Sequence, residues 1–180
     1  MTVVILHGIQ GHAGIHWQQW LHDELIKNNY QVLMLELPNS IHPDRQESLD
    51  FIIKLIDTIP RDEEIIIVGH SLGATMALDY LENATRKIKK LISVSGFALD
   101  WNSELNSYFM KEKNIDFNKV LNNLESSIVL YGDNDPYVPQ NVLMALANEL
   151  KVIPQIIPGG GHLNTEFGYT QFPQLLEVLK

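Results

Sequence analysis

Ser71 lies in the stretch Gly69-His70-Ser71-Leu72-Gly73, between an apolar run at 65–68 and a helical pattern at 74–81. A G-x-S-x-G sequence between a strand and a helix is typical of a nucleophile elbow, a sharp turn that projects a serine hydroxyl. The glycines suit this turn, because a side chain at either position would collide with the neighbouring strand or helix. We therefore expect Ser71 to act as a nucleophile. A simple helix cap is the alternative interpretation.

A serine nucleophile needs a histidine and a carboxylate, and both follow later apolar runs. His162 comes after the glycines at 159–161, and two candidate aspartates precede it at 133 and 135. The chain order serine, aspartate, histidine is that of an α/β-hydrolase triad. We predict that Ser71 attacks an acyl carbonyl, that His162 accepts and returns the proton, and that an aspartate orients the imidazole.

Asp133 and Asp135 compete for the role of the acid. Prolines at positions 136 and 139 would stiffen the chain just beyond Asp135. Asp133 lies directly after a glycine, where a turn or capping aspartate is common. We therefore predict the triad Ser71, Asp135 and His162.

The oxyanion formed in acyl transfer needs N–H donors. The N–H of Leu72 stands at the start of the helix beside Ser71, where the helix end is positive. A second donor is expected from the loop after the first strand, which begins His7-Gly8-Ile9-Gln10. We predict that the N–H of Ile9 has this role, with the N–H of Gln10 as second choice.

Apolar runs alternate with helical patterns along the whole chain. The expected strands are 3–6, 31–35, 65–68, 91–94, 128–131 and 152–157, and the expected helices are 15–28, 44–59, 74–81, 141–150 and 172–179. Such alternation predicts an α/β fold with a mostly parallel sheet of about six strands and helices on both faces. The carboxyl ends of parallel strands meet at one edge, so the candidate residues are brought together there.

The composition limits the class of protein. A chain of 180 residues predicts one domain over 1–180, and the absence of cysteine excludes disulfides and a thiolate nucleophile. The net charge of −9 argues against nucleic-acid binding, and the basic cluster at 86–90 is interpreted as a solvated helix end. No leader and no run long enough to span a membrane are evident, so we expect a cytoplasmic protein without a membrane partner.

The sequence resembles the YdeN family of small serine hydrolases, to which the retinoblastoma-binding protein nine group is related. The resemblance covers nearly the whole chain. It is carried by the elbow and by His16-Trp17, Trp20-Leu21, Ser95-Gly96-Phe97, Asp135-Pro136-Tyr137-Val138-Pro139 and Gly161-His162-Leu163-Asn164. The resemblance implies a compact α/β-hydrolase without a large cap domain, and it implies Asp135 rather than Asp133 as the acid.

We expect a carboxylesterase-like serine hydrolase that cleaves small acyl esters, with thioesters and small amides as further candidate substrates and no cofactor. The expected pocket residues are His7, Phe97, Trp101, Tyr108 and Tyr137. Activity should fall as the pH drops through about 6.5, because a protonated histidine cannot act as a base.

Three other interpretations of the sequence compete with hydrolysis. A protein-binding module with little or no catalysis is the alternative function, which the complete triad disfavours. The first loop also suggests a dinucleotide site, with Glu36 at the end of the second strand, but its spacing of Gly8, Gly11 and Gly14 is not G-x-G-x-x-G. His12 and His16 have the spacing of a metal pair but no evident third ligand, so no metal is expected.

Overall fold

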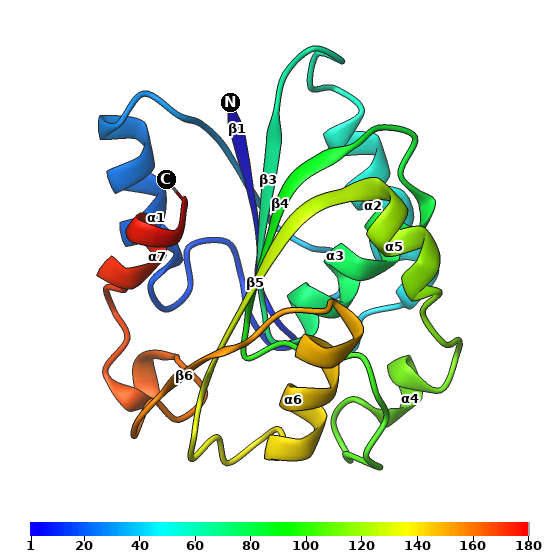
Figure 1. Ribbon diagram of the computed structural model, residues 1–180, viewed down its shortest axis with the longest axis vertical. Helices are drawn as coiled ribbons and strands as arrows, with labels where there is room; N and C mark the ends of the chain where they lie inside the picture. Colours follow the sequence, from blue (N-terminus) through cyan, green and yellow to red (C-terminus); the bar gives the residue numbers. More distant parts are fainter. Residues whose placement is uncertain (180) are drawn as a thin grey trace.

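The computed structural model describes residues 1–179 and contains one six-stranded sheet (Figure 1). All neighbouring strands are parallel, in the order β2-β1-β3-β4-β5-β6. Their bounds are Thr2–Leu6 (β1), Gln31–Leu35 (β2), Ile65–His70 (β3), Ile88–Val94 (β4), Leu124–Gly132 (β5) and Gln155–Ile157 (β6). From β1 the chain adds β2 on one side of the sheet and then β3 and the later strands on the other side. At such a change of direction, between β1 and β3, parallel α/β sheets open a crevice for ligands.

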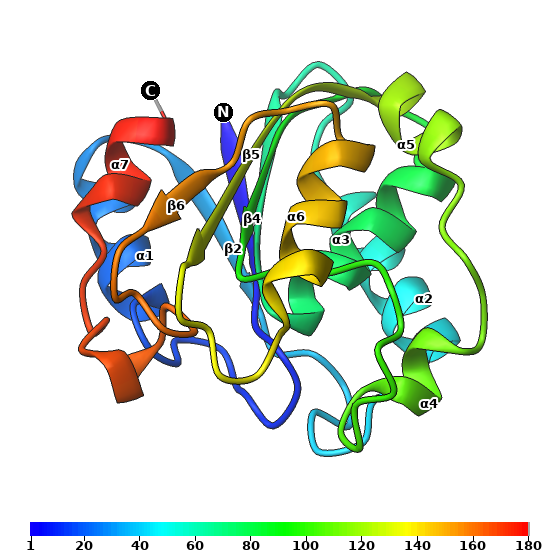
Figure 2. The same cartoon turned by 60° about the horizontal axis from the view of Figure 1, so that its bottom comes forward.

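Helices cover both faces of the sheet (Figures 1 and 2). Helices α1 (Gln18–Lys27) and α7 (Pro173–Leu179) pack together on one face. The other face carries α2 (Arg45–Ile56), α3 (Leu72–Asn83), α5 (Phe117–Asn123) and α6 (Gln140–Glu149). Two shorter helices, α4 (Ser107–Met110) and the 3-10 helix η1 (Thr165–Phe167), lie in loops. The predicted layer arrangement is confirmed.

The position of strand β1 in the interior of the sheet explains why its residues are almost all apolar. Val4 and Leu6 belong to the core under α2 and α3, whereas Val3 and Ile5 belong to the core under α1 and α7. A central parallel strand is buried on both faces and needs no polar alternation. The two cores fix the strand ends that present the candidate residues.

Helix α1 begins at Gln18, later than the expected start at Ile15. The reason lies in the backbone, because Gly14 and His16 have φ angles of 86° and 59°. Left-handed residues of this kind interrupt a right-handed helix. Strand β6 is likewise shorter than expected and begins at Gln155.

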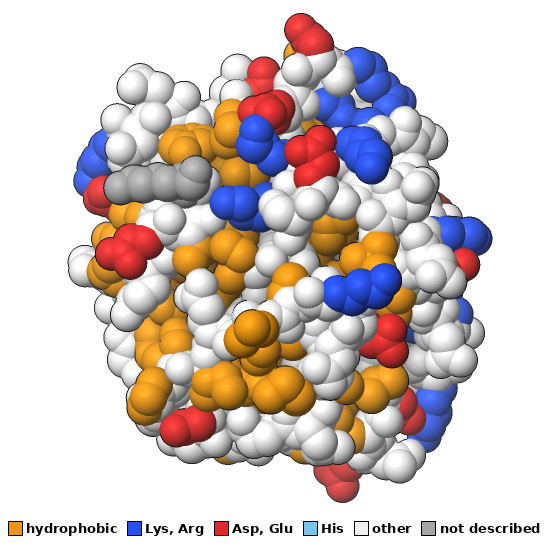
Figure 3. Space-filling model, viewed as in Figure 1, with side chains coloured by type: hydrophobic (Ala, Val, Ile, Leu, Met, Phe, Trp, Pro, Cys, Tyr) orange, Lys and Arg blue, Asp and Glu red, His pale blue; other side chains and the backbone are white. Residues whose placement is uncertain are grey.

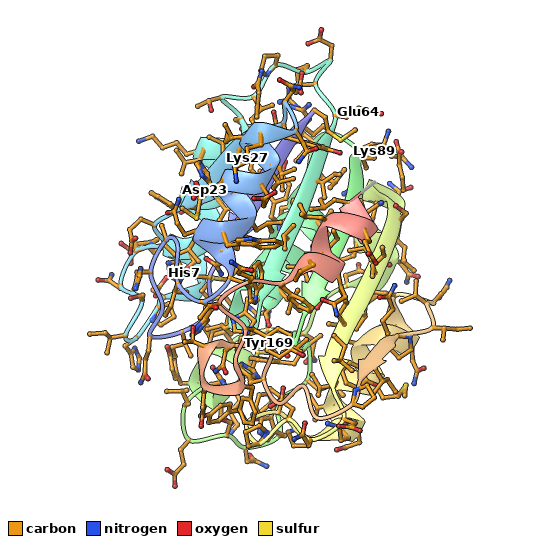
Figure 4. The ribbon with its side chains drawn as sticks, turned by 90° about the vertical axis from the view of Figure 1, so that its left-hand side faces the viewer. His7, Asp23, Lys27, Glu64, Lys89 and Tyr169 are labelled. Carbon is orange, nitrogen blue, oxygen red and sulfur yellow. The ribbon has the colours of Figure 1, made fainter. Side chains whose placement is uncertain are left out.

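The interpretation of residues 86–90 as a solvated helix end is wrong, because β4 begins at Ile88. Lys89 forms an ion pair with Glu64, and Figure 4 places the two together at the end of the sheet away from His7. Arg86 donates to the carbonyl oxygens of Ile59 and Pro60 at 3.0 and 2.9 Å. The cluster therefore closes the amino-terminal edge of the sheet.

Strand β6 forms one edge of the sheet, and Ile156 within it is 46% exposed. In the view of Figure 1, β6 lies at the lower left. Figure 3, in the same orientation, shows hydrophobic side chains gathered over the lower-left part of the surface and charged side chains toward the top. No helix within residues 1–179 combines the length and hydropathy needed to cross a membrane.

Candidate active site

Ser71 occupies a tight turn between β3 and α3, with φ 54° and ψ −126°. Its N–H donates to the carbonyl of Val94 at the end of β4, at 2.9 Å. A Cβ at Gly69 would lie 2.6 Å from Cα of Ala74, and a Cβ at Gly73 would lie 2.4 Å from the carbonyl oxygen of His7. Side chains at these two positions would therefore collide with the helix and with the end of β1, as the sequence predicts.

His162 and Asp135 meet at the carboxyl edge of the sheet, although 27 residues separate them. Nδ1 of His162 lies 2.8 Å from Oδ2 of Asp135. The other carboxylate oxygen accepts from the N–H groups of Tyr137 and Val138 at 2.9 and 3.1 Å. Since the carboxylate only accepts, Nδ1 carries the proton and Nε2 keeps a free lone pair. This is the tautomer that a general base requires.

The backbone around His162 is held by two buried rings. Nε2 of His70 lies 2.9 Å from the carbonyl oxygen of His162, and Nε1 of Trp17 donates to the carbonyl of Leu163 at 2.9 Å. Burial is the main cause that lowers the pKa of His70 well below 6.5, so its ring is neutral. His70 therefore supports His162 rather than titrating beside it.

Asp133 binds the glycine loop. Its Oδ1 accepts from the N–H of Gly159 at 2.8 Å, and the neighbouring Asn134 accepts from the N–H of Gly161 at 2.7 Å. These bonds hold the loop that delivers His162 against the end of β5. The two aspartates thus have separate contacts, with Asp133 on the loop backbone and Asp135 on the imidazole.

Ser71 and His162 line one cavity of about 260 Å³, and both are more than nine-tenths buried. Half of its lining residues are apolar, aromatic or glycine, and the other half carry uncharged polar or imidazole side chains. Besides these two, the lining residues are Gly8, Ile9, Gln10, Gly11, Ile15, His16, His70, Leu105, Asn106, Tyr137, Val138 and Asn164. Within residues 1–179 this lining contains no charged side chain. The cavity suits a small, uncharged ligand.

His16 is a cavity residue that the sequence did not assign to the site. Its Nδ1 lies 2.9 Å from the hydroxyl of Thr165 and accepts from the N–H of that residue at 3.3 Å. Burial, followed by the nearby His162, lowers the pKa of His16 to about 4. The ring is therefore neutral and carries its proton on Nε2.

Backbone hydrogen bonds in the loop after β1 distinguish the two N–H groups that are candidates for the second oxyanion donor. The N–H of Gln10 donates to the carbonyl of Ser40 at 2.6 Å, so it is not free for the role given as second choice. Ile9 lines the cavity, and Leu72 is the first residue of α3 beside Ser71. Gly8 must remain glycine, because a Cβ there would lie 2.9 Å from Cβ of Ser71.

His7, which the sequence predicts to be a pocket residue, lies outside the lining of this cavity. It is buried, its Nδ1 donates to the carbonyl of Gly8 at 2.8 Å, and its Nε2 accepts from the N–H of Leu37 at 3.1 Å. Burial is the main cause that lowers its pKa. The ring ties the loop after β1 to the chain after β2. Figure 4 labels the position of His7.

Of the expected aromatic residues, only Tyr137 lines the cavity. Phe97 is fully buried in the core and packs edge-on against Trp101 at 4.7 Å between ring centroids. Tyr108 stacks on His42 at 3.9 Å. Phe97, Trp101 and Tyr108 therefore lie outside the lining of this cavity and pack against other parts of the chain.

Leu105, Asn106 and Asn164 are cavity residues that the sequence did not single out. Asn164 belongs to the Gly-His-Leu-Asn segment and His16 to the His-Trp segment, so each stands in a stretch that carries the family resemblance. Leu105 and Asn106 come from the irregular chain before α4, where nothing in the sequence pattern marks them.

The chain is similar to known hydrolases along most of its length. It is 27% identical to hydrolase YdeN of Bacillus subtilis over 98% of this chain and 93% of the relative. It is also 27% identical to serine hydrolase RBBP9 of Rattus norvegicus, over 91% of this chain and 84% of the relative.

Solved structures agree with the sequence relatives. The crystal structure of the ydeN gene product of B. subtilis superposes with a TM-score of 0.90 at 26% identity, covering 99% of this chain and 96% of that one. An extracellular α/β-hydrolase from a Paenibacillus species gives 0.70 at 16% identity over 99% and 98% of the two chains, which supports the fold alone. The chain has the expected α/β-hydrolase fold. The family model for serine hydrolases matches residues 3–180, so the chain belongs to the serine hydrolase family.

Proposed function

We propose that this serine hydrolase cleaves small acyl esters through a covalent acyl-enzyme, with Ser71, His162 and Asp135 as its triad. The observation that carries the proposal is the 2.8 Å bond between Asp135 and Nδ1 of His162, beside a serine on a glycine-flanked elbow in the same cavity. Buried carboxylate, imidazole and hydroxyl groups in this chain order are what nucleophilic acyl transfer requires.

The reaction follows from the tautomer. Nε2 of His162 removes the proton of the Ser71 hydroxyl as the oxygen attacks the ester carbonyl. The N–H groups of Leu72 and Ile9 stabilise the oxyanion, and the imidazolium, which Asp135 stabilises, protonates the departing alcohol. Water then attacks the acyl-serine by the same route, which releases the acid and restores the hydroxyl.

The size and charge of the cavity support a short substrate. Pockets for drug-sized ligands usually span about 300–1,000 Å³, and the cavity of about 260 Å³ lies just below that range. We therefore expect 4-nitrophenyl esters of two to six carbons to be cleaved faster than those of ten carbons or more. A rate that rises steeply with longer chains would contradict a short acyl substrate.

The test of the nucleophile is labelling by a fluorophosphonate probe, which reacts with activated serines. The wild-type protein should be labelled at Ser71, and Ser71→Ala should not. Ser126 lies outside the cavity lining, so Ser126→Ala is a matched control and should be labelled like the wild type. A folded wild-type protein that fails to react would refute the proposed triad.

A further inference from the structure

Two asparagines stand at helix N-cap positions without capping their helices. Asn106 precedes α4 and Asn164 precedes η1, and neither side chain makes a capping hydrogen bond. Two other helices have the usual bond: Asp44 accepts from the N–H of Glu47, and Asp116 accepts from two N–H groups of α5. An N-cap asparagine normally accepts in the same way. The two amides are therefore directed elsewhere.

The side-chain oxygen of each asparagine is buried without a partner. Asn106 is 6% exposed and Asn164 is 8% exposed, and the side-chain oxygen of each lacks a hydrogen-bond partner. A buried polar atom left in this state loses its hydration with nothing in return. Such groups are uncommon in folded proteins, and each needs an explanation such as a bound water or ligand. Gln18, Ser93 and Ser95 also have unpartnered buried polar atoms, but these three residues lie outside the cavity lining.

The two amides line the cavity that contains Ser71. They come from separate segments, one before α4 and one after His162, so the fold brings them to this cavity independently. A bound substrate would lie between these segments and the nucleophile. A group of a substrate bound beside Ser71 can supply the partner that these oxygens lack.

The chemistry of the lining selects the kind of group. An amide offers an acceptor oxygen and a donor nitrogen, and a hydroxyl both donates and accepts, so it complements an amide in either orientation. An ammonium or carboxylate would need an opposite charge, and within residues 1–179 the lining provides none. His16 shares the cavity and is neutral, because its pKa is lowered to about 4, mainly by burial.

We propose that Asn106 and Asn164 form a polar subsite for an uncharged hydroxyl group near the scissile bond, so that the preferred substrates are hydroxylated esters. This inference rests on the proposed hydrolysis at Ser71.

The experiment compares isosteric pairs of substrates. On the acyl side, kcat/KM is measured for the 4-nitrophenyl esters of 3-hydroxybutanoate and 3-methylbutanoate, with 3-aminobutanoate as the charged arm. On the alcohol side, 2-hydroxyethyl butanoate is compared with propyl butanoate. One hydrogen bond to the substrate changes kcat/KM by about three- to ten-fold. The hydroxylated ester should therefore have a kcat/KM at least about three-fold higher than its isostere, either on the acyl side or on the alcohol side. Equal rates on both sides, or a preference for the ammonium arm, would overturn the subsite.

Substitutions test whether Asn106 and Asn164 cause the preference for hydroxylated substrates. Asn106→Leu and Asn164→Leu remove the polar atoms at similar size and should each bring the ratio toward one. Asn141 is exposed on α6 outside the cavity lining, so Asn141→Leu should keep the wild-type ratio. A preference that survives in both leucine variants would refute the assignment.

Binding to Ser71→Ala separates this inference from the proposed reaction, because it needs no turnover. 3-Hydroxybutyramide should bind at least three-fold more tightly than 3-methylbutyramide, measured by NMR titration. Equal binding would refute the subsite even if esters are hydrolysed. A clear difference would support the subsite even if fluorophosphonate labelling fails and the proposed triad falls.

Discussion

At the scale of single residues, the site separates two aspartates that lie only two positions apart. Asp135 accepts from Nδ1 of His162, whereas Asp133 accepts from the N–H of Gly159. In the proposed reaction the first contact requires a negative charge beside an imidazolium, whereas the second contact requires only an acceptor oxygen. Replacement by asparagine therefore distinguishes them.

Asp135→Asn should lower kcat by about 10⁴-fold, because an amide in this place favours the wrong imidazole tautomer. Asp133→Asn keeps an oxygen that can accept from Gly159 and should retain activity within about ten-fold. Both are measured as ester hydrolysis on proteins whose circular dichroism matches the wild type. Comparable losses in the two variants would contradict Asp135 as the acid of the triad.

The sequence predicts residues whose chemistry depends on local context better than residues whose role depends on distant neighbours. Gly69 and Gly73 were predictable because the turn itself excludes side chains. Asn106 was not, because an asparagine before a helix ordinarily signals a cap. Only the tertiary structure shows that this side chain makes no capping bond.

At the scale of elements, the segment that carries Asn106 is anchored by a buried arginine. Arg45, the first residue of α2, donates to both carboxylate oxygens of Asp79 on α3 at 2.8 and 2.9 Å. It also donates to the carbonyl oxygens of Phe109 and Lys113 at 3.0 and 2.9 Å, and its guanidinium lies 5.1 Å from the centre of the Phe109 ring. One side chain thus joins α2, α3 and the chain around α4.

Arg45→Met should lower the free energy of unfolding by about 3 kcal/mol, since it leaves the carboxylate of Asp79 buried with weaker compensation. This loss of stability is at the low end of the range for breaking a buried ion pair. The reason is that Lys113 remains 3.2 Å from Asp79. Urea denaturation measures the change. The double variant Arg45→Met, Asp79→Leu should recover part of the loss, and a single variant as stable as wild type would contradict the anchoring role.

The long elements were predictable, because runs such as Ile65–Val68 and the stripe of α2 repeat with the period of a strand or a helix. Helices α4 and η1 have four and three residues, which is too short for a period to show. Their positions depend on contacts such as that of Arg45 with Phe109. The cavity wall contributed by these segments was therefore not predictable in detail.

At the scale of the whole molecule, neutral histidines couple stability to pH. The pKa values of His7, His16 and His70 are all lowered in the folded protein, mainly by burial. The unfolded chain takes up protons on these residues at about pH 6.5. Between that value and the lowered ones it binds more protons than the folded state, so stability rises with pH in this window.

The free energy of unfolding should be constant above about pH 7 and should fall as the pH drops from 6.5 toward 4, the value near which His16 is lowered. Each buried neutral histidine contributes a slope of up to about 1.4 kcal/mol per pH unit. Urea denaturation followed by tryptophan fluorescence measures the slope. His70→Gln should reduce it, whereas His42→Gln, on the exposed surface, should not. A wild-type stability unchanged down to pH 5 would contradict the buried neutral rings.

The backbone angles of Ser71 affect which substitutions at this position stabilise the protein. Its φ of 54° and ψ of −126° are angles that glycine adopts freely and other residues adopt at a cost of about 1–3 kcal/mol. Ser71→Gly should therefore melt a few degrees above Ser71→Ala in a thermal scan, although glycine has the more flexible unfolded chain. Equal melting temperatures would show that the turn is unstrained. If the difference is found, selection for heat resistance alone would favour loss of the proposed nucleophile, and only selection on catalysis would keep the serine in place.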